Sequence, residues 1–152
     1  MGEKMKKVLV LHGVNLDMLG KRDPAQYGTV TLGEIDEQIG KLASELGLAV
    51  ECYQTNHEGE MVEKIHKACE ERVDAVIINA GAWTHYSYAI MDALDILKAP
   101  IIEVHMSNIN ARDEFRQYSV ITPLAKGQIV GFGMNSYLLG LRAAWEEIKK
   151  AG

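Results

Sequence analysis

The stretch that decides the fold is residues 6–33, KKVLVLHGVNLDMLGKRDPAQYGTVTLG. Its aliphatic run predicts a buried strand over Lys6–Leu11, and a long polar segment punctuated by glycine follows. Roughly twenty residues pass before the next helix signal at Thr31, which is long for a loop inside a compact domain. Four aliphatic residues lie among its polar groups, namely Val14, Leu16, Met18 and Leu19. We therefore expect a packed lid over a site, spanning about residues 14–30, rather than a flexible linker.

Apolar segments and amphipathic segments alternate through the rest of the chain. Thr31 and Glu34 form a capping box that predicts a helix start, Gly47 predicts its end, and Asn56 is the expected cap of the second helix. The expected strands are 6–11, 48–54, 74–79, 101–105 and 128–132. The expected helices are 32–46, one that begins near Glu58, 87–97, 111–117 and 136–150.

Short apolar strands that alternate with helices are typical of an α/β domain with a parallel sheet. We expect a flavodoxin-like three-layer sandwich, formed as a single domain over residues 1–152, whose five strands have the order 2-1-3-4-5. That order places the first and third strands side by side, at the switch point where ligands bind beyond the carboxyl ends of the strands.

Composition and charge exclude several classes of protein. A hydrophobic content of 47% and a charged content of 24% are ordinary for a globular protein, and a net charge of −5 argues against a nucleic-acid partner. No apolar run approaches membrane-spanning length. The first apolar run has only four residues, too few for a signal-peptide core, so we expect a cytosolic protein. Cys52 and Cys69 are expected to be reduced core residues.

Polar and ionisable residues follow three of the expected strands. The carboxyl ends of these strands are neighbours in the expected order, so one pocket could collect them. Arg112 and Arg116 are four residues apart and would share a helix face, where paired guanidinium groups suit a carboxylate. The other members of the group are His12, Asn15, Arg22, Tyr27, Asn79, Thr84, His85, Glu103, His105, Ser107 and Asn108.

Taken singly, each of these residues also has a structural explanation. Asn79 could cap the turn after its strand. His85 could form a hydrogen bond at a helix start, and His105 could be a core histidine satisfied by the backbone. Tyr27 could anchor the loop, and either arginine could lie on a solvated face or form an ion pair with Glu103. The functional interpretation therefore depends on their convergence at one edge of the sheet.

Three other chemistries lack support in the sequence. His57 and His66 are nine residues apart and fit no metal-binding helix motif, so we expect no metal. The turn after the first strand has neither the dinucleotide fingerprint nor the phosphate-loop lysine. No strand–turn–helix elbow carries a nucleophile. Acid–base chemistry by tyrosine and histidine remains, with arginines and amides managing charge.

Four motifs resemble, in order and over nearly the whole chain, those of the type II 3-dehydroquinate dehydratases. They are LHGVNLDMLGKRDPAQYG (11–28), QTNHEGEMVEKIH (54–66), IINAGAWTHYSYAIMDAL (77–94) and IEVHMSNINARDEFR (102–116). The family consists of small cofactor-free hydro-lyases of the shikimate and quinate pathways. The resemblance implies a flavodoxin-like fold, homododecamers built from trimers, and elimination of water from 3-dehydroquinate to give 3-dehydroshikimate through an enolate.

The resemblance also implies roles for individual residues. Tyr27 matches the base that removes a proton from carbon 2, and Arg22 matches the lid arginine beside it. Asn15 matches the asparagine that holds a water near the enolate. His105 matches the acid that protonates the departing hydroxyl, and Glu103 lies in the same motif. The matched substrate contacts are Asn79, His85, Met106 through its backbone, Ser107, Arg112 and Arg116, with Asp92 reaching the site of a neighbouring subunit.

Four residues depart from the usual motifs of the family. Val14 and Ala80 replace prolines, Asp17 replaces an asparagine and Trp83 replaces a tyrosine. None has an assigned chemical role, so we expect effects on rate and affinity rather than on the reaction. Asp17 would either weaken the binding of an anionic substrate or pair with Lys21. Two other functions remain open: a non-catalytic binder of small cyclic carboxylates, and a flavin-binding electron carrier.

Overall fold

The computed structural model describes residues 4–21 and 23–152, and it contains one parallel five-stranded sheet with the order β2-β1-β3-β4-β5. The flavodoxin-like α/β architecture and the strand order expected from the sequence are confirmed. The strands are β1 (Lys7–His12), β2 (Ala49–Gln54), β3 (Ala75–Asn79), β4 (Ile101–His105) and β5 (Gly127–Val130).

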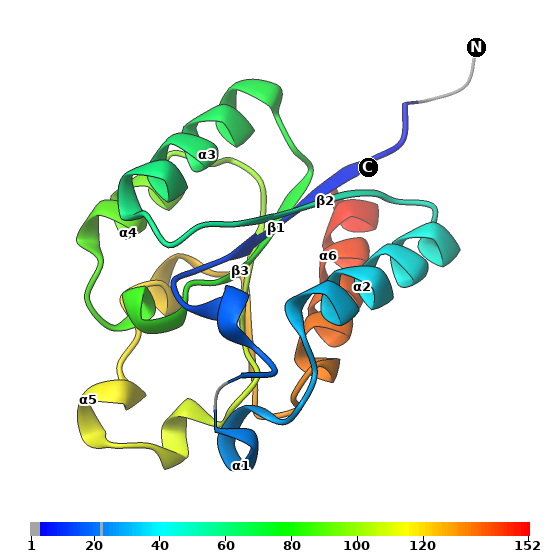
Figure 1. The fold of residues 1–152 in the computed structure, drawn as a ribbon. Helices are drawn as coiled ribbons and strands as arrows, with labels where there is room; N and C mark the ends of the chain where they lie inside the picture. The colour runs from blue at the N-terminus through cyan, green and yellow to red at the C-terminus, as the bar shows by residue number, and fades with distance from the viewer. Residues whose placement is uncertain (1–3, 22) are drawn as a thin grey trace.

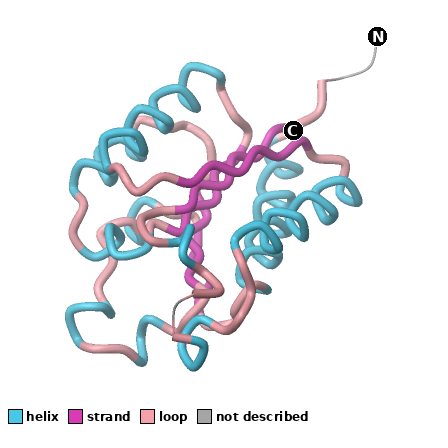
Figure 2. Tube along the Cα trace, viewed as in Figure 1, coloured by secondary structure: helices cyan, strands magenta, loops and turns pink. Residues whose placement is uncertain are grey.

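Helices cover both faces of the sheet and make a three-layer molecule (Figure 1). One layer consists of α2 (Leu32–Leu46) and α6 (Asn135–Ala151), and the other of α3 (Glu58–Glu71) and α4 (Tyr88–Asp95). Figure 2 shows the strands between these two layers. Side chains alternate along each strand, so the sheet contributes to two separate apolar cores.

Short helices occupy the segments beyond the carboxyl ends of the strands. In Figure 1, α1 and α5 lie at the lower end of the view. These helices are η1 (Leu16–Met18), α1 (Pro24–Tyr27), η2 (Gly81–His85), η3 (Ile109–Ala111) and α5 (Glu114–Gln117). The remaining short helix, η4 (Thr122–Leu124), lies instead near the amino ends of β4 and β5. Within the described parts of the chain, every helix is too short or too polar to cross a bilayer.

Local capping explains why the long helices begin and end where they do. The Thr31 hydroxyl accepts a hydrogen bond from the Glu34 amide at 3.2 Å, and Gly47 ends α2 in the left-handed conformation at φ 74°. The Ser87 hydroxyl likewise accepts from the Ile90 amide at 3.1 Å and starts α4. These contacts put the boundaries of α2 where the sequence predicts them.

Two local predictions are wrong. Asn56 does not cap the second helix: His57 precedes α3, and the Asn56 side chain accepts a hydrogen bond from the backbone of Asn15 instead. The helix predicted over residues 111–117 is divided into η3 and α5. Asn108 caps η3 through the Asn110 amide, and Arg112 is extended. Arg112 and Arg116 therefore do not share the face of one continuous helix.

The segment predicted to form a lid contains η1 and α1. Leu16 and Leu19 are buried and pack into the core beneath α2, whereas Met18 is exposed. The Asp23 carboxylate accepts from the Ala25 amide at 3.0 Å and starts α1. Arg22, which the sequence assigns to this lid, lies outside the described residues.

Candidate active site

A small cavity of about 70 Å³ lies at the carboxyl ends of β1, β3 and β4. Its position agrees with the switch point of this strand order. Many of the candidate residues predicted from the sequence line this cavity. Their meeting at one place is the strongest structural support for a functional site. The candidate residues that line the cavity are Asn15, Asn79, His85, His105, Met106, Ser107, Arg112 and Arg116.

The loops after β1 and β3 cross at very close range. The Gly13 amide donates to the Asn79 carbonyl at 2.7 Å. A Cβ atom at Gly13 would lie 2.2 Å from the Ala80 carbonyl oxygen, so the crossing requires glycine. Gly81 is in the left-handed region at φ 61°, and its Cβ would lie 2.9 Å from the Val14 carbonyl. This contact brings Asn79 and the loop after β1 to the same cavity.

Asn15 is held at the edge of the cavity in an unusual backbone conformation. Its φ is 68°, which asparagine tolerates better than most residues. The backbone amide of Asn15 donates to Asn56 Oδ1 at 2.8 Å, and Asn56 Nδ2 donates to Asp17 Oδ2 at 3.1 Å. The Asp17 carboxylate is thus hydrogen-bonded to a neighbouring amide rather than paired with Lys21.

The most strongly polar part of the site is a buried carboxylate behind the cavity. Glu103 has no exposed surface, and its Oε2 lies 2.6 Å from His105 Nε2. Hydroxyl groups of Thr84, Ser119 and Thr122 donate to it at 2.9, 2.7 and 2.6 Å. Burial alone would raise the pKa of Glu103, but the contacts with His105, Thr122 and Ser119 lower it to about 2.

The ionised Glu103 determines the state of His105. A carboxylate only accepts hydrogen bonds, so His105 Nε2 carries a proton. His105 also lines the cavity and is only 4% exposed. The contact with Glu103 therefore fixes the tautomer and the orientation of the His105 ring at the cavity wall.

His85 also lines the cavity, and its ring is neutral. Its Nδ1 donates to the Tyr118 carbonyl oxygen at 2.7 Å. Burial lowers the pKa of His85, and the positive charges of His105, Arg116 and Arg112 lower it further, against the effect of the Tyr118 carbonyl. His85 therefore offers hydrogen bonds without charge, while the arginines supply the positive charge for an anion.

Asn79 is fixed by a chain of buried polar groups. Its Nδ2 donates to the Tyr137 hydroxyl at 2.9 Å, and its Oδ1 accepts from the Gly81 amide at 3.2 Å. The Tyr137 oxygen lies 3.0 Å from His12 Nδ1, and His12 Nε2 lies 2.8 Å from Asp36 Oδ1. His12 therefore lies behind the cavity, bonded to α2 and α6, and is not among the residues that line it.

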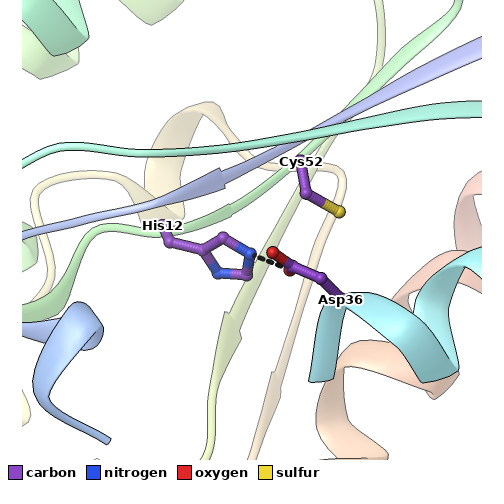
Figure 3. A group of neighbouring side chains, drawn as sticks. All are labelled: His12, Asp36 and Cys52. Atoms are coloured by element: carbon purple, nitrogen blue, oxygen red, sulfur yellow. Dashed lines mark hydrogen bonds and ion pairs between the residues drawn. The ribbon is translucent and has the colours of Figure 1, made fainter. Parts of the chain in front are cut away.

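Among residues 4–21 and 23–152, one set of three neighbouring side chains has the ligand types of a metal site: His12, Asp36 and Cys52. Figure 3 shows the Asp36 side chain from α2 between the His12 ring on β1 and the Cys52 sulfur on β2. Cys52 and Cys69 are free and half-buried, which corrects the expectation of core residues. Burial, and then the charge of Asp36, raise the pKa of the Cys52 thiol.

Several residues chosen from the sequence are not part of the small cavity. Asp92 is exposed on α4. The Tyr27 side chain, like Arg22, lies outside what the structure describes. Its helix α1 borders a larger open groove of about 760 Å³, which shares Met106, Ser107 and Arg112 with the small cavity. A ligand larger than a few water molecules would have to extend from the cavity into this groove.

A family model described as Dehydroquinase class II matches residues 6–145. The chain belongs to this family. The 3-dehydroquinate dehydratase of Syntrophotalea carbinolica is 72% identical over 145 residues, covering 95% of this chain and 98% of the relative.

Two solved class II dehydroquinases have the same fold as this chain. The type II dehydroquinase of Butyrivibrio crossotus superposes with a TM-score of 0.90 at 42% identity, covering 92% of this chain and 97% of that one. The type II dehydroquinase of Propionibacterium acnes gives 0.88 at 44% identity, covering 96% and 99%. The family resemblance drawn from the four sequence motifs is confirmed.

Two departures from the usual motifs of the family lie in the core. Ala80 and Trp83 are buried at 1% and 5% exposure and pack with α3 and α4. Val14, in contrast, lines the small cavity. The departure that is best placed to change ligand affinity is therefore Val14.

Several polar residues that support the site were not predicted from the sequence. Ser119 and Thr122 follow α5 with no motif of their own, and only the fold brings them to Glu103. Tyr137 does carry a signal, because it precedes Leu141 and Ala144 by four and seven residues on the buried face of α6. That spacing would have predicted a buried tyrosine that needs a hydrogen-bond partner.

Proposed function

We propose that this chain is a 3-dehydroquinate dehydratase that eliminates water from 3-dehydroquinate to give 3-dehydroshikimate through an enolate. Membership of the class II dehydroquinase family and the names of its relatives support the reaction. The structural observation that carries the proposal is the contact between cavity-lining His105 and the ionised, buried Glu103.

His105 acts as the acid in the proposed mechanism. Loss of the hydroxyl as hydroxide is difficult at neutral pH, so a proton must reach the departing oxygen. Glu103 stabilises the protonated imidazole before transfer and orients its ring through Nε2. The three hydroxyl groups that bind Glu103 keep this carboxylate ionised, and therefore keep it from taking the proton itself.

Tyr27 acts as the base that removes the proton next to the ketone. A free tyrosine has a pKa of about 10, so it is a weak base at neutral pH unless its anion is stabilised. We assign that role to the guanidinium of Arg22, five residues earlier in the same lid. Closure of the lid would expel water and strengthen the interaction. The border that α1 forms with the shared groove supports this assignment.

The remaining cavity residues bind the substrate and its enolate. Arg112 and Arg116 supply positive charge for the substrate carboxylate. Asn15 holds a water that donates to the enolate oxygen, where fixed donors lower the barrier most. The other proposed contacts, through hydroxyl groups of the ring, are Asn79, His85, Ser107 and the Met106 backbone, with Asp92 from a neighbouring subunit of a homododecamer built from trimers.

The proposed mechanism uses no cofactor and forms no covalent intermediate. A Schiff base with the ketone would need a lysine at the cavity. The described residues that line the cavity supply histidines, arginines and amides, but no lysine. The proposed mechanism therefore relies on proton transfer and electrostatic stabilisation by these residues.

The direct test is an absorbance assay for the conjugated enone of the product, with purified protein and 3-dehydroquinate. We expect turnover without added metal or cofactor. Thermal stabilisation by the substrate without any product would instead indicate the non-catalytic binder of cyclic carboxylates. Neither product nor stabilisation would contradict both the reaction and the assigned site.

A further inference from the structure

We propose that His12, Asp36 and Cys52 form a binding site for a thiophilic divalent cation of the Zn²⁺ class, and that an ion there lowers the substrate affinity of the cavity. The site lies on the face of the sheet that packs against α2 and α6. The binding step is independent of the proposed function. The effect on affinity rests on the proposed function, because it is transmitted to Asn79.

The three side chains are the ligand types that Zn²⁺ prefers. An imidazole nitrogen, a carboxylate oxygen and a cysteine sulfur come from β1, α2 and β2, and their ligand atoms all lie within 4.8 Å of one another. Cys52 pairs with Val10 in the sheet, so it projects on the same side as His12, two residues further along β1. Neutral imidazole, carboxylate and thiolate together balance a 2+ charge, with the thiol proton released to solvent.

The surroundings of the three ligands also suit an ion. His12 is completely buried, whereas the Asp36 side chain is 37% exposed and leaves a path for entry from solvent. The second ring nitrogen of His12 already contacts the Tyr137 hydroxyl at 3.0 Å. Metal-binding histidines commonly make such an outer contact, which fixes the tautomer and the orientation of the ring.

The direction of each hydrogen bond follows from the acceptor at one end. The Asp36 carboxylate accepts from His12 Nε2, which leaves Nδ1 of the neutral ring as an acceptor. The Tyr137 hydroxyl therefore donates to His12, and its oxygen accepts from Asn79 Nδ2. Asn79 Oδ1 is then free to accept from the Gly81 amide at the cavity wall. Each group in the chain is satisfied in this arrangement.

An ion on His12 reverses these directions. The metal takes the Nε2 lone pair, so the ring proton moves to Nδ1 and now donates to the Tyr137 oxygen. The Tyr137 proton then needs a new acceptor, and the nearest amide oxygen in the chain belongs to Asn79. Turning the Asn79 amide to meet it removes the acceptor from Gly81 and exchanges donor for acceptor at the cavity. We assign substrate binding to the arrangement seen in the structure, in which Asn79 Oδ1 accepts from the Gly81 amide. Occupancy of the cation site removes that arrangement and therefore weakens substrate binding.

Cobalt is the probe for the binding step, because thiolate ligation of Co²⁺ gives a charge-transfer band and tetrahedral geometry gives intense visible bands. We expect one equivalent to bind the full-length protein with both signals, and Zn²⁺ to displace it. Cys52→Ser and Cys52→Ala should remove the charge-transfer band, and Asp36→Asn should weaken binding at least about tenfold. Cys69→Ser is the matched control and should keep the band.

The same titration can overturn the site. Absence of a thiolate band at millimolar Co²⁺, or a band that persists in both Cys52 variants, would mean that the three residues form only a buried ion pair beside an inert thiol. These outcomes involve no turnover, so they leave the proposed dehydratase reaction unaffected.

The coupling is tested by the Michaelis constant for 3-dehydroquinate at saturating Zn²⁺. We expect KM to rise at least about fivefold in the wild type and in Cys69→Ser, with a smaller change in kcat. Cys52→Ser should keep the basal kinetics and lose the response to Zn²⁺. An unchanged KM in a protein shown by cobalt displacement to be loaded, or an equal response in Cys52→Ser, would overturn the coupling.

Discussion

Glu103 Oε2 lies 2.6 Å from His105 Nε2 at a position where Glu103 has no contact with solvent. A buried carboxylate is costly unless each of its oxygens is satisfied. Here the Thr122 hydroxyl binds Oε1, while the hydroxyl groups of Thr84 and Ser119 bind Oε2 together with His105. The chain thus maintains a negative charge directly behind the one histidine assigned as the acid.

Replacing Glu103 by glutamine should lower kcat by about 100-fold or more with little change in KM, because the amide removes the charge that stabilises protonated His105. The enone assay measures both constants. Glu147→Gln is the matched control, since Glu147 is largely buried on α6 and pairs with Lys126 and Lys150. Equal kcat values for Glu103→Gln and wild type would remove Glu103 from the mechanism.

The lowered pKa of Glu103 also predicts how stability responds to acid. A carboxyl whose pKa falls from 4.5 to about 2 on folding stabilises the native state at pH above the unfolded value. The shift in pKa corresponds to a contribution of about 3 kcal/mol to the free energy of unfolding. This contribution is fully present near neutral pH and is lost as the pH falls through 4 towards 2. Urea unfolding of wild type and Glu103→Gln should therefore differ most at pH 7 and converge near pH 2. A difference that is constant with pH would contradict the assignment of charge.

Gly13→Ala should be severely destabilising. Its Cβ would lie 2.2 Å from the Ala80 carbonyl oxygen, so the loops after β1 and β3 would have to separate. We expect a loss of at least about 2 kcal/mol in the free energy of unfolding, together with a lower kcat in any folded fraction. Gly40→Ala in the middle of α2, where a Cβ meets nothing within 4 Å, should instead stabilise the protein by about 0.5–1 kcal/mol. Similar effects of the two variants would mean that the crossing is not tightly packed.

Arg22→Ala should reduce kcat by at least about 100-fold while KM changes much less, because the proposed task of Arg22 is to stabilise the tyrosinate and not to hold the substrate. Arg22→Lys keeps the charge and should retain part of the rate. A variant that loses affinity but keeps kcat would make Arg22 a substrate-binding residue.

The sequence predicts the fold well because the decisive signals are local. The apolar runs of β1 and β3 and the Thr31 and Gly47 caps of α2 determine element type without distant partners. The prediction fails where a side chain has a tertiary use. Asparagine is a favoured helix cap, but the Asn56 side chain accepts a hydrogen bond from the backbone of Asn15 instead. The helix predicted over 111–117 is interrupted because Asn108 caps a shorter turn first.

The candidate site could be predicted only in part for a related reason. Residues in motifs, such as Asn79 and His105, are found by their place at the end of a strand. Ser119 reaches the site through the packing of distant elements, and its sequence context gives no sign of that role. The helical spacing of Tyr137 marks it as buried but does not identify Asn79 as its partner. The buried hydrogen-bond chains therefore emerge only from the folded structure.

The most direct test of the account is the rate of Tyr27→Phe in the enone assay, measured beside wild type at the same pH. The phenol is the proposed base, and phenylalanine keeps the ring but removes the oxygen. We predict that kcat falls by at least about 100-fold while the variant still gains thermal stability from 3-dehydroquinate. Turnover at the wild-type rate would contradict the central claim that a lid tyrosine removes the proton.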